Sequence, residues 1–130
     1  MREPRLSVIV STYNRPQALR LVLQGLLAQT QRDFEVIVAD DGSGPPTREV
    51  VDRFLPAFGG RLRHVWQEDQ GFRVAAARNR ALEVASGAVA CFLDGDCIPR
   101  SEFVECHARH SKSNRILRGA RVLLSESISR

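Results

Sequence analysis

Two aspartates separated by one glycine, Asp94-Gly95-Asp96, carry the clearest chemical signal in the sequence. Carboxylates this close repel each other unless protons or a cation lie between them. Mg²⁺ and Mn²⁺ prefer oxygen ligands, and Mg²⁺ typically binds one or two carboxylates together with phosphate oxygens. Gly95, which has no side chain, would let a phosphate approach the backbone closely. The pattern indicates a site for Mn²⁺ or Mg²⁺ and a diphosphate; a turn whose aspartates cap the local backbone is the alternative.

Two further polar clusters follow apolar runs in the same way. Ser11-Thr12-Tyr13-Asn14 follows one run, and Asp40-Asp41-Gly42-Ser43-Gly44 follows another. Asp41 is a candidate to accept a hydrogen bond from a nucleobase N–H; the alternative is a plain turn between a strand and a helix. Tyr13 is a candidate to lie against a base, and the alternative is a partly buried loop aromatic.

Arginines gather around a helix predicted from about Val74 to Ala85. Arg73 and Arg80 are seven residues apart and share a helix face, while Arg78 lies off that face. Arginines near a diphosphate would neutralise its charge. The alternative is that they are simply solvated, as exposed arginines on helices commonly are.

The histidines and cysteines do not form a recognisable zinc pattern. Cys106 and His110 are one helical turn apart, but no complementary pair has zinc-finger spacing. His107 and His110 are therefore expected to be surface or internally bonded histidines. His64 is expected to be a strand residue with no special role.

The elements that must position these side chains alternate between strand and helix. Apolar β-branched runs predict strands, and apolar residues at helical spacing predict helices. Ser86-Gly87 is expected to stop the third helix, and Ser101 to cap the fourth. The predicted strands are Leu6–Val10, Phe34–Ala39, Leu62–Trp66, Ala88–Leu93 and Ile116–Leu124; the predicted helices begin near Pro16, Pro45, Val74 and Ser101, the last ending near Ser111.

This alternation predicts an α/β fold with a mostly parallel sheet covered by helices on both faces. Ligands bind at the carboxyl ends of the strands in such sheets. The three polar clusters all follow strand ends, so the fold should bring them together along one rim. Their convergence is the main reason to expect a ligand site.

The composition limits the class of protein. The chain has 130 residues, with 43% hydrophobic and 26% charged residues, which is typical of one soluble globular domain. Its net charge of +4 suits an anionic ligand or peripheral contact with a membrane, but does not by itself indicate nucleic acid. The sequence shows no signal peptide and no membrane-spanning run. Three cysteines without close pairing indicate a reducing cytoplasm, with the inner face of the membrane as an alternative location.

Other nucleotide and phosphate chemistries lack their motifs. No G-x-G-x-x-G follows the first strand and no Walker A loop occurs, which argues against NAD-dependent and P-loop enzymes. A phosphatase with Asp94 as nucleophile would need a later lysine and acidic pair, but Lys112 is the only lysine and no such pair follows it. A sugar nucleotidyltransferase would need a glycine- and arginine-rich loop after the first strand, unlike Ser11 to Pro16.

Four segments of the sequence form a set with a recognisable order: Ser7-Val8-Ile9-Val10-Ser11-Thr12-Tyr13-Asn14-Arg15, Phe34 to Ser43, Ala77-Arg78-Asn79-Arg80-Ala81-Leu82 with Ser86-Gly87, and Phe92 to Pro99. Together they resemble family 2 glycosyltransferases with the Rossmann-like GT-A fold. Their order and spacing match from about Leu6 to Pro99, and Gln67 to Arg73 resembles the branch that includes chondroitin-type polymerases and galactosyltransferase-like members.

The resemblance implies a role for each matching position. Ser11, Thr12, Tyr13 and Asn14 would lie by the base and ribose, and Asp41 at the uracil edge. Asp94 would face the ribose or the metal, Asp96 would be the principal metal ligand, and Arg78 and Asn79 would lie near the donor. The implied reaction moves a sugar, with inversion, from a nucleotide diphosphate such as UDP to a hydroxyl of a saccharide or lipid-linked acceptor.

One part of the family pattern is missing from this sequence. The general base and a histidine metal ligand come from a downstream acceptor-binding half, and neither is recognisable before Arg130. The chain is therefore expected to be the nucleotide-sugar-binding part of a GT-A domain, truncated before that half. The alternative is a non-catalytic nucleotide-sugar-binding module or an inactive fragment.

Overall fold

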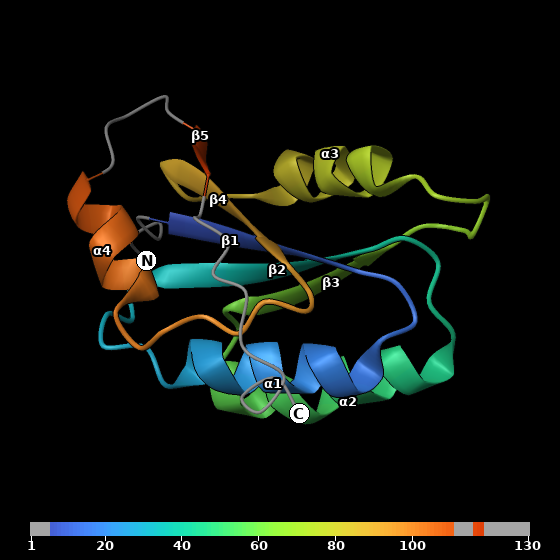
Figure 1. Cartoon of the computed structure of the whole chain (residues 1–130), viewed down its shortest axis with the longest axis horizontal. Coiled ribbons are helices and arrows are strands. Elements are labelled where there is room, and N and C mark those ends of the chain that lie inside the picture. The colour runs from blue at the N-terminus through green and yellow to red at the C-terminus, as the bar shows by residue number, and fades with distance from the viewer. Residues whose placement is uncertain (1–5, 111–115, 119–130) are drawn as a thin grey trace.

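A computed structural model describes residues 6–110 and 116–118. In these residues a parallel sheet of five strands has the order β3-β2-β1-β4-β5, with helices on both faces (Figure 1). The predicted α/β fold with a parallel sheet is confirmed. The elements are β1 (Leu6–Thr12), α1 (Pro16–Leu27), β2 (Phe34–Asp40), α2 (Pro45–Phe58), β3 (Leu62–Trp66), α3 (Val74–Val84), β4 (Val89–Asp94), α4 (Phe103–His110) and β5 (Ile116–Arg118).

The two central strands, β1 and β2, are buried along their whole length. Strands covered on both faces are expected to be apolar along most of their length. Val8–Val10 and Val36–Ala39 meet this expectation, and Ser7 and Glu35 are buried polar exceptions near the strand starts. The register of β1 and β2 aligns Thr12 with Asp40, and the pairing of β1 with β4 aligns Ser11 with Asp94. The sheet thus places the three polar clusters next to one another at its carboxyl edge.

The helices cover the two faces unequally. In Figure 1, α1 and α2 lie on one side of the sheet and α3 on the other. The larger core cluster joins the first side of the sheet to buried residues of α1 such as Leu19 and Leu23. The smaller cluster packs Ala77 and Ala81 of α3 against Ile9 and Ile37. The small side chains of these two alanines allow α3 to lie close to β1 and β2.

The segment after β4 runs back along α1 to α4, and Gln29 fixes it. The amide Nε2 of Gln29 donates to the carbonyl of Arg100 at 2.6 Å, and its Oε1 accepts from the N–H of Val104 at 2.8 Å. Gln29 therefore satisfies a backbone N–H of the first turn of α4, a role expected for Ser101. α4 begins at Phe103, and the Ser101 hydroxyl donates to the side chain of Glu102 instead. The prediction that Ser101 caps this helix was therefore wrong.

α3 ends just before Ser86-Gly87, where the sequence predicted a stop, but Gly87 lacks the left-handed conformation of a helix-ending glycine and is needed instead for close packing. α3 ends at Val84, and the capping residue that follows it, Ala85, has an extended backbone conformation. A Cβ on Gly87 would lie 2.5 Å from Ser7 Oγ, so a larger residue does not fit. At the end of α2, by contrast, Gly59 adopts the left-handed conformation with φ 57°, which is usual for a glycine that follows a helix.

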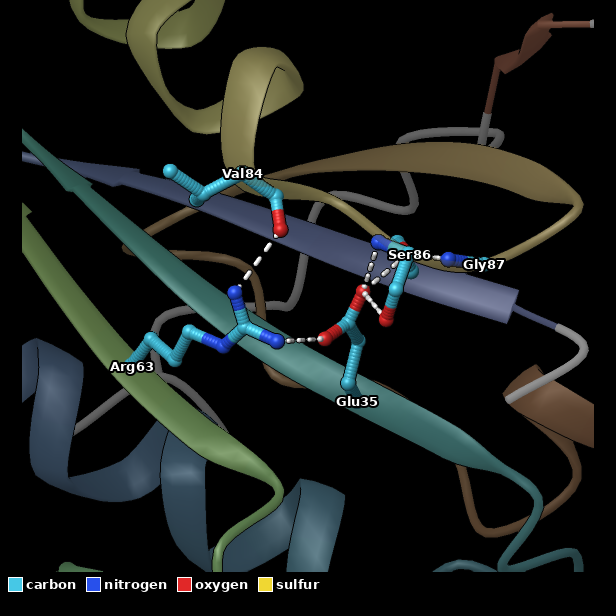
Figure 2. Close-up of polar contacts among 6 residues, drawn as sticks. Glu35, Arg63, Val84, Ser86 and Gly87 are labelled. Atoms are coloured by element: carbon cyan, nitrogen blue, oxygen red, sulfur yellow. Dashed lines mark hydrogen bonds and ion pairs between the residues drawn. The ribbon is translucent and has the colours of Figure 1, made fainter. Parts of the chain in front are cut away.

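A buried carboxylate, Glu35, ties together the turn that leads into β4. Figure 2 shows Glu35 of β2 facing Ser86, with Arg63 of β3 beside it. Its Oε2 accepts from Ser7 Oγ and Ser86 N, both at 2.6 Å, and its Oε1 lies 3.4 Å from Arg63 Nη2. Arg63 Nη1 also donates to the carbonyl of Val84 at 2.8 Å. These contacts join β1, β2, β3 and the end of α3.

The remaining element predictions differ mainly at their ends. β1, β2 and β4 each extend into the polar cluster that follows the predicted strand. Only Ile116–Arg118 of the last predicted strand is described, and 119–124 lie outside the described residues. No helix in the described part of the chain has the length and apolarity needed to cross a membrane.

The Glu35 cluster predicts a pH dependence of stability. Burial opposes ionisation of Glu35, but hydrogen bonds from Ser7 and Ser86 outweigh it and hold the pKa below the ordinary 4.5. The ionised carboxylate therefore stabilises the fold above that pH, and this stability is lost as pH falls through the lower folded pKa. Glu35→Gln should lower the free energy of unfolding by about 1–3 kcal/mol at neutral pH.

Urea denaturation over a series of pH values measures this effect. Glu35→Gln should also lose stability less steeply than the parent chain below the ordinary pKa. Glu83→Gln, at an exposed carboxylate of α3, is the matched control and should change neither quantity. Equal stability of Glu35→Gln and Glu83→Gln at neutral pH would contradict the role given to Glu35.

Candidate functional site

A pocket of about 340 Å³ lies where the carboxyl ends of β1, β2 and β4 meet. Its volume falls in the range of small-molecule sites. It brings together eight of the ten site residues predicted from the sequence, with Arg15, Phe72 and Val74 in addition. The lining residues are Ser11, Thr12, Tyr13, Arg15, Asp41, Phe72, Val74, Arg78, Asp94, Gly95 and Asp96.

Gly95 connects the aspartate pair to the end of β1. Its N–H donates to the carbonyl of Ser11 at 2.7 Å, and a Cβ at this position would overlap that same carbonyl oxygen. Thr12 also lies within 3.2 Å of the position of such a Cβ. The chain's own packing therefore requires the glycine, whereas the sequence had suggested that it makes room for a phosphate.

Asp94 and Asp96 provide a cluster of possible metal ligands. Their carboxylate oxygens and Cys97 Sγ all lie within 4.8 Å of one another. Asp94 Oδ1 accepts from Arg78 Nη2 at 3.1 Å and from Ser11 Oγ at 3.4 Å. Two carboxylates suit Mg²⁺ or Mn²⁺, while a thiolate suits softer metals. The donor set therefore fits a hard divalent cation on the two aspartates.

Arg15 lines the pocket, although the sequence pattern indicated no role for it in ligand binding. It is the last residue of the Ser7–Arg15 segment that resembles the family. Its Nη1 lies 3.9 Å from Asp96 Oδ2, and both side chains are partly exposed. Each aspartate of the pair thus faces one guanidinium, Arg78 for Asp94 and Arg15 for Asp96. The signal that could have identified Arg15 is its position in the same strand-end loop as Ser11 to Asn14.

Asp41 holds the loop between β3 and α3 against the pocket. Its side chain is buried, with Oδ1 accepting from Gln67 Nε2 and Oδ2 from the N–H of Arg73, both at 2.7 Å. Gly42 passes so close to Asp69 that a Cβ there would lie 2.5 Å from Asp69 Cα. Each carboxylate oxygen has two lone pairs, so Asp41 can also accept a further N–H from a ligand.

Two aromatic side chains flank the pocket. Tyr13 is 45% exposed, and its hydroxyl donates to Asp69 Oδ2 at 2.8 Å. This hydrogen bond, with the nearby charge of Asp69, raises the pKa of Tyr13 above its ordinary value. Phe72 is 91% exposed, although it lines the pocket. The loop after β1 thus presents one ring whose hydroxyl is hydrogen-bonded, and the loop between β3 and α3 presents one ring that is almost fully exposed.

Two predicted site residues do not line the pocket. Asn14 has φ 48° and joins two loops, because its N–H donates to Ser43 Oγ at 2.7 Å and its Oδ1 accepts from Gly44 N at 2.8 Å. Asn79 is exposed on α3 outside the pocket lining. Of the arginines around α3, Arg78 reaches the pocket, while Arg73 bonds Gln70 Oε1 with its guanidinium at 2.7 Å.

His64 has a structural partner that the sequence did not predict. Its Nε2 lies 2.7 Å from Oδ2 of the buried Asp40, and Asp40 Oδ1 accepts from the N–H of Ser43 at 2.9 Å. Burial opposes ionisation of Asp40, but these hydrogen bonds outweigh it and lower the pKa of Asp40. The expectation for His107 is met, because its Nδ1 lies 2.8 Å from the carbonyl of Phe103.

The charges around the pocket favour a cation and an anion together. Three carboxylates and two guanidiniums line it, leaving a formal balance of one negative charge. A diphosphate alone would be repelled by this excess of negative charge, whereas one divalent cation would make the formal balance of the pocket positive. The side chains at this strand-end rim therefore suit a metal and a phosphate-bearing ligand bound together.

Sequence comparison identifies the family to which this fold and pocket belong. Residues 7–117 match the profile described as "Glycosyl transferase family 2". The chain belongs to glycosyl transferase family 2. This membership confirms the resemblance drawn from the four sequence segments and agrees with the predicted GT-A fold.

Relatives of known function match most of this chain but extend well beyond it. Validoxylamine A glucosyltransferase of Streptomyces hygroscopicus subsp. jinggangensis (strain 5008) is 42% identical over 104 residues, which cover 78% of this chain and 24% of the relative. Chondroitin synthase of Escherichia coli is 37% identical over 103 residues, covering 78% of this chain and 15% of the relative. The chain thus spans a quarter or less of the length of these two proteins.

Solved structures show the same arrangement. S. aureus TarS 1-349 in complex with UDP-GlcNAc superposes with a TM-score of 0.74 at 30% identity, covering 81% of this chain and 30% of that one. Mannosyltransferase PcManGT from Pyrobaculum calidifontis, in complex with GDP-Man and Mn2+, gives a TM-score of 0.67 at 32% identity, covering 78% and 30%. Both neighbours were solved with a nucleotide sugar.

The close approach at Gly95 gives a prediction for both stability and metal binding. Gly95→Ala should displace Asp94 and Asp96 from the end of β1 and cost about 1–3 kcal/mol of stability through overpacking. Gly44→Ala is the matched control, because a Cβ there would make only ordinary contacts of 3.8 Å or more. Chemical denaturation and Mn²⁺ titration measure the two effects; a Gly95→Ala chain that matches Gly44→Ala in both would contradict the proposed constraint.

Proposed function

We propose that this chain is the donor-binding part of an inverting glycosyltransferase that uses a nucleotide-diphosphate sugar, with UDP as the nucleotide. The acceptor would be a hydroxyl of a saccharide or of a lipid-linked acceptor. The observation that carries this proposal is the convergence of Ser11 to Tyr13, Asp41 and Asp94 to Asp96 in one pocket at the strand ends. The nucleotide sugars bound by the structural neighbours support the same assignment.

Asp94 and Asp96 would hold Mn²⁺ or Mg²⁺, with Asp96 as the principal ligand. Such a cation supplies charge stabilisation to a diphosphate leaving group. Arg78 and Arg15 are positioned to neutralise the remaining phosphate charge, because each already faces one of the two carboxylates. Guanidinium groups bind phosphate oxygens with two parallel N–H donors, which favours orientation as well as affinity.

The nucleoside would occupy the end of the pocket lined by Tyr13, Asp41 and Phe72. Asp41 has free lone pairs with which to accept a base N–H, and the Tyr13 ring offers a face for stacking. The pocket's lining also includes Thr12, whose hydroxyl is buried and lacks a hydrogen-bond partner in the described residues. A ribose or base group that reached this hydroxyl would satisfy it.

The deprotonation of the acceptor is assigned to a general base outside this chain. None of the pocket's three carboxylates is free for that role in the proposed assignment, since two hold the cation and Asp41 holds the loop and base. We therefore expect these 130 residues alone to bind donor and transfer little or no sugar. The competing possibility is a non-catalytic nucleotide-sugar-binding module. Such a module would bind the donor equally well, but it would not transfer sugar even when joined to an acceptor-binding half.

Calorimetry with UDP and Mn²⁺ tests the metal assignment. Asp96→Asn should weaken UDP binding in Mn²⁺ by at least about tenfold, or roughly 1.4 kcal/mol, and should remove the effect of adding EDTA. Cys97→Ser is the matched control and should bind as the parent chain does, because the cation is assigned to oxygen ligands. Loss of binding in Cys97→Ser with none in Asp96→Asn would overturn this assignment.

Substitutions at Tyr13 separate its ring from its hydroxyl. Tyr13→Phe keeps the stacking surface and should change UDP affinity by no more than about twofold, whereas Tyr13→Ala should weaken it by about tenfold. The same calorimetry, with uridine as a second ligand, shows whether the loss concerns the nucleoside. Equal losses in Tyr13→Phe and Tyr13→Ala would assign the effect to the Tyr13–Asp69 hydrogen bond instead.

A further inference from the structure

A second pocket, of about 400 Å³, lies beside the edge strand β3 and shares no lining residue with the first. The turn from Asp41 to Gly44 separates them, because Asp41 lines the first pocket, and Ser43 and Gly44 line the second. The glycosyltransferase assignment makes no use of this second pocket. Its lining residues are Ser43, Gly44, Pro45, Arg48, Glu49, Asp52, His64 and Trp66.

The second pocket is formed by one face of a helix and one face of a strand. Arg48, Glu49 and Asp52 are spaced by one, three and four residues on α2, so they project from the same side of the helix. His64 and Trp66 are two residues apart on β3 and therefore point to the same side of the sheet. A row of charged groups thus lies opposite an aromatic surface.

Trp66 provides a fixed aromatic surface in this pocket. Its side chain is 50% exposed, and its Nε1 donates to the carbonyl of Ser43 at 3.0 Å. The hydrogen bond uses the polar edge of the indole and leaves its apolar surface half exposed. Neighbouring His64 is held by the buried Asp40 at 2.7 Å, so both rings of the strand face have fixed positions.

The charged groups opposite Trp66 retain their hydrogen-bonding capacity. Among the described residues, the side chains of Arg48, Glu49 and Asp52 make no hydrogen bond or ion pair with one another or with any other group. All three are exposed. The pocket therefore offers carboxylate acceptors and guanidinium donors within reach of an aromatic ring.

We propose that this second pocket binds a neutral saccharide. A sugar ring has an apolar face of C–H groups and a rim of hydroxyls, so it needs both an aromatic surface and hydrogen-bonding groups. Trp66 would cover the C–H face, Glu49 and Asp52 would accept from hydroxyls, and Arg48 would donate to sugar oxygens. Ions fit less well, because a cation would meet Arg48 and an anion would meet the two carboxylates.

The proposal gives the glycosyltransferase a second point of contact with a sugar chain, away from the donor pocket. The saccharide site rests on the proposed function in one respect only: that function identifies the bound saccharide as the acceptor or the product of the transfer. The two pockets have separate lining residues, so binding in one can be tested while the other is left intact. A saccharide held here would raise the local concentration of acceptor near the enzyme.

Fluorescence titration tests this proposal directly, because Trp66 is the only tryptophan of the chain. The probes are cellopentaose, maltohexaose and N-acetylchitopentaose, with glucose as a monosaccharide and choline as a cation. At least one oligosaccharide should change the Trp66 emission saturably, and the double variant Glu49→Ala/Asp52→Ala should weaken that binding at least about fivefold. Glu83→Ala, which removes an exposed carboxylate of α3, should leave it unchanged.

Each outcome has a defined meaning. Saturable binding that the double variant loses while its melting temperature and UDP–Mn²⁺ affinity stay unchanged supports the saccharide site. A response to choline alone, or no saturable response to any oligosaccharide, overturns it. A chain that binds an oligosaccharide here but not UDP with Mn²⁺ would instead contradict the proposed function, so the two failures are distinguishable.

Discussion

The hydrogen bond from the N–H of Gly95 to the carbonyl of Ser11 joins the ends of β1 and β4. It forms only because residue 95 has no Cβ, since any side chain would overlap the Ser11 oxygen. The strand pairing already aligns Ser11 with Asp94, and the glycine extends that contact by one residue into the loop. Asp94 and Asp96 are consequently positioned by the sheet itself, and the geometry of the proposed metal site depends on this contact.

The buried carboxylates of this domain have a different task from the exposed pair. Glu35, Asp40 and Asp41 are each almost fully buried and accept two or more hydrogen bonds from the protein. Burying a charge without partners would be strongly destabilising, so each of these groups fixes the loop that supplies its donors. Asp94 and Asp96 are more exposed and face arginines, which leaves them accessible to a ligand.

The sequence predicted the order of the elements and the meeting of the polar clusters, since both follow from local patterns. Apolar runs identified the strands, and the rule for parallel sheets brought Ser11, Asp41 and Asp94 to one edge. Contacts between residues distant in sequence were not predictable in this way. No local pattern links Gln29 to Val104, or Asp40 to His64, and the steric need for Gly95 appears only when β1 and β4 are paired.

Errors at the helix ends had the same origin. Ser101 has a good capping side chain, yet Gln29, 75 residues from Val104, supplies the acceptor at the start of α4. Gly87 resembles a helix stop, yet its position is dictated by contact with Ser7, 80 residues away. In both cases a contact with a residue distant in sequence takes the place of the local helix-end interaction that the sequence pattern predicted.

The pairing of each aspartate with an arginine explains how the site can be stable both before and after a ligand binds. Without a cation, Arg78 and Arg15 offset the repulsion between the carboxylates of Asp94 and Asp96. In the proposed function, Asp94 and Asp96 would hold a divalent cation that offsets this repulsion, and the two guanidiniums would then be able to bind phosphate oxygens. Asp94, Asp96, Arg15 and Arg78 would therefore remain in charge balance when a donor binds, because the positive charge of the cation would offset the negative charge of the diphosphate.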